Sequence, residues 1–311
     1  MKVRAATLSA IYKLPTGAMR RALFASSHRR MPHFRRPLTF SDKVNWRILN
    51  DRRPLLEWTC DKLAMKDHAR HVPGLHIPDT LWAGTDLREL ASARLPEHWI
   101  LKPNHRTGLV YFGHGQPDIE QLSAVTGSWL RRVEAEKLRE WAYSKARPMF
   151  LVEEVLGTPG SAPPDYKCYV FDGDVAVVEV IHRPTSNHRL YLPDWSPLTV
   201  RWGYDLAPVE PPPAGLGRML AAAAELGSGF DFIRIDLYNI GGEIYFGEFT
   251  TYPGSGLERI TPASFDTELG ARWTLPSRRR LKNSSVSTNG FQAFVATLPI
   301  DEGCVGGSAP Q

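Results

Sequence analysis

The segment from residue 234 to 254 carries two acidic residues in a setting that suits metal-ion chemistry. Asp236 lies in an apolar run, the pair Gly241-Gly242 follows, and a second apolar run carries Glu248. Two short apolar runs around such a glycine pair predict a β-hairpin, which would bring both carboxylates to one end of a sheet. A buried carboxylate needs a partner, and Mg²⁺ prefers oxygen ligands while leaving positions open for phosphate. The segment therefore predicts a magnesium site at Asp236 and Glu248.

Arg234 lies two residues before Asp236, so on an ideal strand both side chains face the same side. A cation beside two metal-binding carboxylates suits an anionic substrate or a charged transition state. The alternative interpretation is an ordinary hairpin with edge carboxylates, in which Arg234 forms a structural salt bridge. This segment alone leaves both interpretations open.

Other segments carry residues suited to nucleotide binding. Lys102 ends an apolar stretch just before a glycine-containing loop at 104–115, where it could donate to phosphate oxygens. Glu153, Glu154 and Val155 end another apolar strand and could form a hinge that pairs with an adenine edge and ribose hydroxyls. A solvated strand exit explains each of these segments equally well when it is considered alone.

A second hairpin is predicted by Asp172-Gly173, which separates two apolar runs at 166–171 and 175–181. Lys167, at its start, could be a second phosphate ligand. Arg183, just after it, could neutralise a substrate carboxylate or a transferring phosphoryl group. A surface lysine and an exposed arginine are the simpler alternatives.

Helices and strands are interspersed along the chain with several hairpins, so we expect an α+β fold. The pattern predicts helices that begin at Thr39 or Ser41 and at Asp61-Lys62, and a long helix over 122–146. We expect four regions, namely a basic leader (1–37), a first lobe (38–148), a second lobe with the metal site (149–276) and a largely disordered tail (277–311).

Composition excludes several classes of protein. The 311 residues are 42% hydrophobic and 23% charged, as in a globular protein, and no apolar run approaches a membrane span. The basic N-terminus makes a poor signal peptide and leaves room for weak membrane-surface contact, although an ordinary basic helix explains it more simply. Three scattered cysteines suit a reducing compartment such as the cytoplasm. The net charge of +5 comes without a nucleic-acid-binding motif, so we expect no nucleic-acid partner.

The order of these segments resembles the ATP-grasp ligases, and within them the TupA-like branch. The segments that carry the resemblance are Leu38 to Trp46, Asp61-Lys62, Lys102-Pro-Asn, Val152-Glu-Glu, Asp165-Tyr-Lys, Arg234-Ile-Asp and Gly247-Glu-Phe-Thr250. The resemblance implies an ATP-grasp fold, in which two α+β lobes with antiparallel sheets clasp MgATP.

The resemblance also implies roles for individual residues. Asp236, Glu248 and Thr250 match the metal ligands, and Arg234 matches an arginine near an acyl phosphate. Many relatives carry asparagine where Thr250 stands, and a hydroxyl is a weaker ligand, which places a second metal ion in doubt. Lys102 and Lys167 match the phosphate-binding lysines, which would reach in from the lobe opposite the acids. The adenine and ribose hinge is matched by Glu153, Glu154 and Val155.

The implied activity is an ATP-dependent carboxylate–amine ligation through an acyl phosphate, with ATP and Mg²⁺ as cofactors. The substrates would be a small-molecule carboxylate and an amine, in the biosynthesis of a cell-surface polymer or a peptide natural product. Two alternatives remain open at this point: a phosphotransferase that acts on a sugar or glycan, and a non-catalytic module that binds an anionic polymer.

Overall fold

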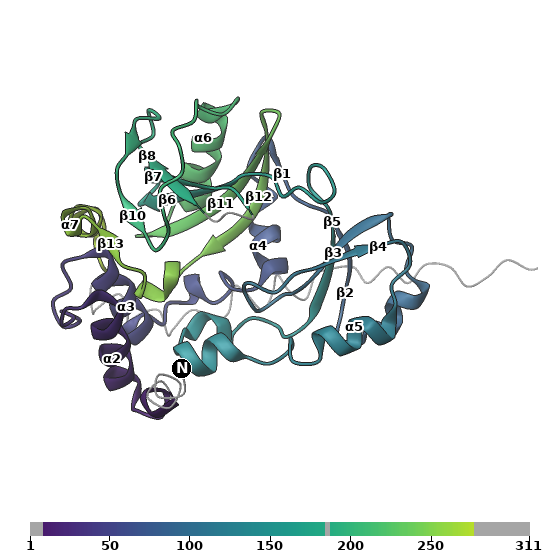
Figure 1. Ribbon diagram of the computed structural model, residues 1–311, viewed down its shortest axis with the longest axis horizontal. Coiled ribbons are helices and arrows are strands. Elements are labelled where there is room, and N and C mark those ends of the chain that lie inside the picture. The colour runs from purple at the N-terminus through teal and green to yellow at the C-terminus, as the bar shows by residue number, and fades with distance from the viewer. Residues whose placement is uncertain (1–8, 184–186, 277–311) are drawn as a thin grey trace, which may run out of the picture.

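The computed structural model describes residues 9–183 and 187–276, and the tail expected to be disordered (277–311) lies outside these ranges. Its strands form two main sheets, which Figure 1 shows apart from each other. The seven-stranded large sheet has the order β1 (Leu75–His76), β12 (Glu243–Thr250), β11 (Ile233–Ile240), β6 (Asp165–Phe171), β7 (Asp174–Ile181), β8 (His188–Tyr191) and β9 (Pro197–Leu198). The four-stranded small sheet has the order β2 (Thr80–Gly84), β5 (Phe150–Glu154), β3 (His98–Pro103) and β4 (Tyr111–His114). A separate antiparallel pair consists of β10 (Arg201–Trp202) and β13 (Ile260–Thr261).

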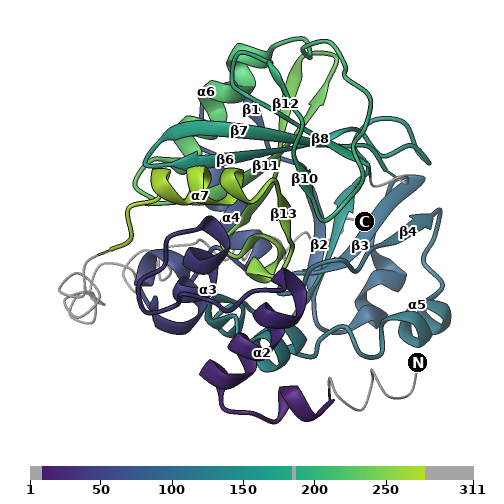
Figure 2. The same cartoon turned by 60° about the vertical axis from the view of Figure 1, so that its left-hand side comes forward.

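Helices cover and connect these sheets. They are α2 (Thr16–His28), α3 (Phe40–Asn50), α4 (Lys62–Ala69), α5 (Ile119–Thr126), α6 (Leu216–Gly227) and α7 (Ala263–Arg272). Helix α4 lies between the two sheets (Figure 1), and α3 lies beside α2 and α7 (Figure 2). Because neighbouring strands are antiparallel except β1 and β12, the chain has the expected α+β class. No described helix has both the length and the apolar run that crossing a bilayer requires.

Both predicted hairpins are confirmed. Asp172-Gly173 joins β6 to β7, and Gly241-Gly242 joins β11 to β12. All four turn residues have positive φ, at 52°, 87°, 62° and 91° in that order. Two central residues with positive φ are the mark of the primed turns, whose twist matches that of the flanking strands. The Asp-Gly pair therefore sets the alignment of β6 with β7, and the Gly-Gly pair that of β11 with β12.

The two faces of the large sheet differ in chemistry. Helix α6 packs across β11, β6 and β7, where Gly227 lies so close to Val170 that a Cβ atom would be 2.4 Å from it. On the opposite face, Phe40 of α3 packs edge-on against Tyr169, Phe171 and Phe232. The aromatic cluster covers only part of that face. Charged side chains occupy the part that lies next to it.

The small sheet has an apolar face and a polar face. Burial alternates along β3, so Trp99 and Leu101 are buried while Lys102 is only partly covered. Trp99 and Leu101 pack with Leu122 of α5 and with Phe150 and Val152 of β5. Lys102 therefore points away from this apolar cluster, on the face that also carries Glu153.

The structure corrects part of the expected organisation. Residues 16–28 do not form a separate leader, because α2 packs on the rest of the chain and its Met19, Arg20 and Phe24 are fully buried. The expected boundary at residue 149 is also wrong, since β5 follows it and is a central strand of the small sheet. The expected long helix at 122–146 is broken, because α5 ends at Thr126 before Gly127 and only short helical turns follow.

Candidate active site

Four charged residues form one row across four neighbouring strands of the large sheet. Strand register pairs Asp236 with Glu248 on β12 and with Lys167 on β6, and it pairs Lys167 with Glu179 on β7. Residues directly opposite each other on neighbouring strands point to the same face. We call Glu248, Asp236, Lys167 and Glu179 the polar row. Two of its members, Asp236 and Glu248, are the acids that the sequence predicts to meet.

A β-bulge sets the position of Glu248. The register shifts after Asp236, so that Leu237 pairs with Phe246 and Gly247 is the extra residue. A Cβ atom at Gly247 would lie 2.7 Å from the carbonyl oxygen of Asp236, which only glycine can avoid. The bulge therefore turns Glu248 to the side that carries Asp236.

Asp236 is held between two cations. Arg234 donates from Nε and Nη2 to its two carboxylate oxygens, each at 2.6 Å, and Lys167 Nζ lies 2.7 Å away. Burial alone would raise the pKa of Asp236, but Arg234 and then Lys167 reverse this effect and hold the pKa below its ordinary value. The structural salt bridge considered for Arg234 is thus present, and it keeps Asp236 ionised.

Arg234 also connects Asp236 to the next strand. Its Nη2 donates to Thr250 Oγ1 at 2.9 Å and lies 4.0 Å from Glu248 Oε1. The hydroxyl of Thr250 is 3.5 Å from the same Glu248 oxygen. The three residues expected to bind metal therefore surround a single guanidinium group.

These residues fit a magnesium ion. The part of the large sheet that carries the polar row holds four carboxyl groups, on Asp165, Glu179, Asp236 and Glu248. It holds two basic groups, on Lys167 and Arg234. A divalent cation would offset this excess of acid. Each carboxylate oxygen has two lone pairs, so Asp236 can ligate an ion while it keeps its cationic partners. Glu248 is only half-buried, and within the part of the chain that the structure describes its polar contacts with Arg234 and Thr250 are long, at 4.0 and 3.5 Å.

Lys167 lies in a place that the sequence does not predict. It stands on the same sheet as Asp236, rather than on the opposite lobe, and is 7% exposed. Its Nζ contacts Asp165 at 2.6 Å and Asp236 at 2.7 Å. Asp165 belongs to the Asp165-Tyr-Lys segment that carries the family resemblance, but the sequence predicted no role for it. Arg183 lies beyond β7 and is exposed, and among the described residues no ion pair joins it to the polar row.

Glu179 closes the polar row and was also missed by sequence reasoning. Tyr169 donates its hydroxyl to Glu179 at 2.9 Å, and His188 Nδ1 lies 2.6 Å from the other oxygen. The backbone N–H of Trp202 donates to His188 Nε2, so Nδ1 carries the proton and donates to Glu179. Burial would raise the pKa of Glu179, but the hydrogen bond from His188 and the charge of Arg234 lower it.

The small sheet contributes a second charged group, around the Glu153 of the predicted hinge at Glu153, Glu154 and Val155. Glu153 contacts Lys102, and Lys66 Nζ lies 2.7 Å from it. Its carboxylate thus forms ion pairs with two lysines. Glu154 also has partners, since its N–H donates to the backbone carbonyl of Asp79 and its carboxylate accepts from the Asp79 N–H at 2.8 Å. Val155 follows the end of β5.

Acidification should weaken the fold through Glu153. Burial would raise the pKa of Glu153, but Lys102 and Lys66 hold it below the ordinary value of 4.5. A carboxyl group with a lowered folded-state pKa contributes stability above its unfolded pKa and loses it as the pH falls through the folded value. Between about pH 5 and about pH 3, we expect the urea midpoint to fall more in the wild type than in Glu153→Gln. Equal losses in the two proteins would contradict this assignment.

Lys62 connects the two charged groups. It opens α4, whose N-cap Asp61 accepts from Ala64 N–H, and its Nζ donates to the Arg106 carbonyl at 2.6 Å. Burial lowers the pKa of Lys62, while Glu248 on the large sheet raises it. Lys62 therefore experiences charges of both sheets. The sequence pattern pointed to Asp61-Lys62 but assigned no role to either residue.

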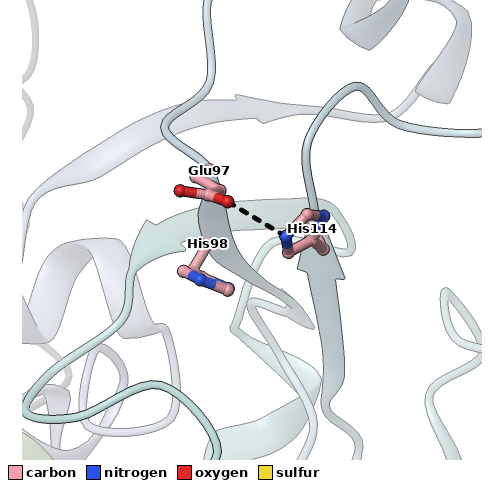
Figure 3. A group of neighbouring side chains, drawn as sticks. All are labelled: Glu97, His98 and His114. Atoms are coloured by element: carbon pink, nitrogen blue, oxygen red, sulfur yellow. Dashed lines mark ion pairs between the residues drawn. The ribbon is translucent and has the colours of Figure 1, made fainter.

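A separate group of possible metal ligands lies on the hairpin of β3 and β4. Figure 3 shows Glu97 directed at His114 of β4, with His98 next to Glu97 at the start of β3; Glu97 and His114 lie 3.2 Å apart. The ligating atoms of the three residues lie within 4.8 Å of one another. His98 stands four residues from Lys102, or about 13 Å along an extended strand. We therefore treat this group as distinct from the charged group around Lys102 and Glu153.

Known proteins resemble this chain in sequence or in structure. A family model described as TupA-like ATPgrasp matches residues 42–274. D-alanine–D-alanine ligase from Bacillus anthracis with ATP has 17% identity and a TM-score of 0.44, with 75% of this chain and 70% of that chain covered. The same enzyme from Helicobacter pylori has 18% identity and a TM-score of 0.40, with 70% and 62% covered.

D-cycloserine synthetase DcsG has 15% identity and a TM-score of 0.37, with 71% of this chain and 72% of that chain covered. No protein of curated function matches the sequence. The family model covers most of the chain, including the acid pair on β11 and β12 and the lysine-bearing strand β3. The chain belongs to the TupA-like ATP-grasp family and has its α+β fold.

Proposed function

We propose that this chain is an ATP-dependent carboxylate–amine ligase, which forms an amide or peptide bond through an acyl phosphate. The observation that carries the proposal is the register of Asp236 with Glu248, with Arg234 between them, in a chain of the ATP-grasp family. Buried Cys60 and Cys168 are free, which supports a place in the cytoplasm. The product would enter a cell-surface polymer or a peptide natural product.

The charged residues of the two sheets and of α4 would have different roles. Asp236, Glu248 and the Thr250 hydroxyl would hold Mg²⁺, which when bound offsets the charge on the β- and γ-phosphates. Lys167 and Arg234 keep the Asp236 carboxylate ionised and fixed. Lys62 and Lys102 would bind the triphosphate from α4 and the small sheet.

The reaction would need no protein nucleophile. An oxygen of the substrate carboxylate attacks the γ-phosphorus, and the bond to the β-phosphate oxygen breaks as ADP leaves. The amine nitrogen then attacks the acyl carbon, phosphate leaves with the electron pair, and protons pass to water. Arg234 would stabilise the charge that develops on the transferred group. Positioning and electrostatics would supply most of the acceleration.

A screen of carboxylate and amine pairs tests the activity. We expect ADP release that requires both partners, with mass spectrometry showing an amide and free phosphate in equal amounts. A stable phosphoester instead of an amide would identify a phosphotransferase. Absence of any rise in melting temperature with a MgATP analogue would favour a non-catalytic binding module, because a ligand of the native state alone stabilises it.

Lys102→Ala should raise the KM for ATP about tenfold through loss of a charged contact to phosphate. The fold should survive, because Lys66 continues to neutralise Glu153. Lys145→Ala is a matched control, since Lys145 is an exposed lysine paired with Glu57. An unchanged KM in Lys102→Ala, measured by ADP release, would remove Lys102 from the nucleotide site.

A further inference from the structure

A cavity of 720 Å³ is lined by the strand pair β10–β13, by residues 203–205 and 257–259 next to these strands, and by Asn187 just before β8. Its walls carry charged residues of both signs, Arg201, Asp205, Glu258 and Arg259. A second cavity, of 590 Å³, is lined largely by apolar groups such as Val177, Leu198 and Leu269. The first cavity thus has the chemistry of a site for a charged small molecule.

Glu258 stands out among the charged residues of this cavity. Its side chain is half-buried, and among the described residues it makes no hydrogen bond or ion pair. Two glycines with positive φ leave room for it: a Cβ atom at Gly254 would lie 2.4 Å from its carboxylate, and one at Gly203 would lie 3.6 Å away. A half-buried carboxylate without a partner is costly unless a ligand satisfies it.

Glu258 also joins the cavity to the polar row. Burial and then the like charge of Glu179 raise the pKa of Glu258, while Arg234 and Lys167 lower it. Geometry shows the same proximity, because His188, which donates to Glu179, accepts from the N–H of Trp202 and has its ring 5.6 Å from that of Tyr204 on the cavity wall. The cavity therefore lies next to the Glu179 end of the polar row.

The charges indicate which substrate enters the cavity. An anionic donor carboxylate would be repelled by Glu258, whereas an ammonium group would form a charge-assisted hydrogen bond with it. Arg259 is exposed on the wall of the same cavity, and Arg201 lies on that wall 3.8 Å from Asp205. Guanidinium groups are suited to a carboxylate. A molecule that carries both an amine and a carboxylate satisfies all of these groups.

We propose that this cavity binds the amine substrate, that Glu258 receives its ammonium group, and that the substrate is an amino acid or peptide amine whose carboxylate meets Arg259 and Arg201. This inference rests on the proposed ligase function. It distinguishes amino acids from amino sugars that have no carboxylate. Glu258 would bind the ammonium group of the substrate, which passes one proton to water, and the neutral amine nitrogen would then attack the acyl carbon.

Hydroxylamine separates this inference from the proposed function. It is a small nucleophile that converts an acyl phosphate to a hydroxamate, and it needs no amine-binding cavity. With a carboxylate found by the screen, Glu258→Gln should form hydroxamate at the wild-type rate and keep the wild-type KM for ATP. Its KM for the amino acid should rise about thirtyfold, as expected for the loss of one charge-assisted hydrogen bond of about 2 kcal/mol.

A second pair of variants tests the carboxylate. Arg259→Gln should reduce the preference for an amino acid over its decarboxylated amine about tenfold. Arg272→Gln is the matched control, because Arg272 is an exposed arginine beside the second cavity. A wild-type enzyme that uses the two amines equally would overturn the substrate class.

Two further results would overturn the role of Glu258. Equal losses of hydroxamate and amide in Glu258→Gln would show a purely structural role. An unchanged KM for the amine would show that the amine binds elsewhere. Absence of hydroxamate in the wild type with every carboxylate tested would refute the ligase proposal itself, and this inference with it.

Discussion

Glu248→Gln should reduce ADP release more than about 100-fold while the melting temperature stays within about 2 °C of the wild type. Glutamine preserves the size of the side chain but removes the negative charge that a magnesium ligand needs. The fold should tolerate the change, because Glu248 is half-buried and its contacts with Arg234 and Thr250 are 4.0 and 3.5 Å long. ADP release and thermal unfolding of the same preparation measure both effects.

Asp236→Asn should lose activity and stability together. The substitution leaves the buried cations Arg234 and Lys167 without the carboxylate that both contact, which costs on the order of 3–5 kcal/mol. Comparison with Glu248→Gln therefore separates metal binding from the structural salt bridge. Glu243→Gln is the control, because Glu243 is an exposed acid on the same strand, β12. Wild-type turnover in both Glu248→Gln and Asp236→Asn would refute the metal role.

Metal titrations with these variants need one more control. Glu97, His98 and His114 supply two nitrogens and one carboxylate oxygen, a set that suits zinc better than magnesium. His114→Ala removes this group without touching the acid pair. Ion binding that persists in His114→Ala and disappears in Glu248→Gln belongs to the polar row.

Arg20→Met should destabilise the protein by about 3 kcal/mol, a large effect for a residue outside the candidate site. Arg20 is fully buried and donates to Asn45 at 3.0 and 2.6 Å and to the Ser255 hydroxyl at 3.0 Å. It also donates to the Ser255 carbonyl. Burial lowers the pKa of Arg20 to about 10, although the charge of Glu140 opposes this effect.

The effect should reach the substrate cavity. Arg20, Asn45 and His28 all hold the 253–256 loop, which joins β12 to Glu258. Ser255 in this loop has a φ of 55°, a left-handed conformation that a serine keeps only when its surroundings hold it there. We therefore expect Arg20→Met to raise the KM for the amine as well as to lower the melting temperature.

Arg21→Met is the matched control for this prediction. Arg21 follows Arg20 on α2 but is exposed, so its loss should leave both the melting temperature and the KM unchanged. Urea unfolding and amine saturation curves measure the two quantities. If Arg20→Met and Arg21→Met behaved alike, the N-terminal helix would not support the loop.

The hairpins were predictable because their signals are local. Asp172-Gly173 and Gly241-Gly242 tolerate the positive φ of the primed turns, and these turns set the strand register next to each hairpin. The helix that begins after Thr39 was predictable because its signal is also local, since the Thr39 side chain caps it through Asp42 N–H. Local chemistry thus accounts for the two hairpins, whereas the pairing of Asp236 with Glu248 also needs the bulge at Gly247.

The remaining features depend on contacts between distant segments. Glu153 looked like a free hinge acid because Lys66, which neutralises it, lies 87 residues earlier. Arg20 looked like part of a basic leader because its partner Ser255 lies 235 residues later. Lys167 was expected on the lobe opposite the acids because the sequence does not show that β6 pairs with β11. No local pattern carries such information.

The central claim is that Asp236 and Glu248 together hold the divalent ion of a bound nucleotide. Anomalous X-ray diffraction from crystals grown with Mn²⁺ and a non-hydrolysable ATP analogue tests it most directly. The account predicts a manganese peak about 2.1–2.3 Å from an oxygen of each carboxylate and from the analogue's phosphate oxygens. A nucleotide bound with its ion elsewhere, or Asp236 still held only by Arg234 and Lys167, would contradict it.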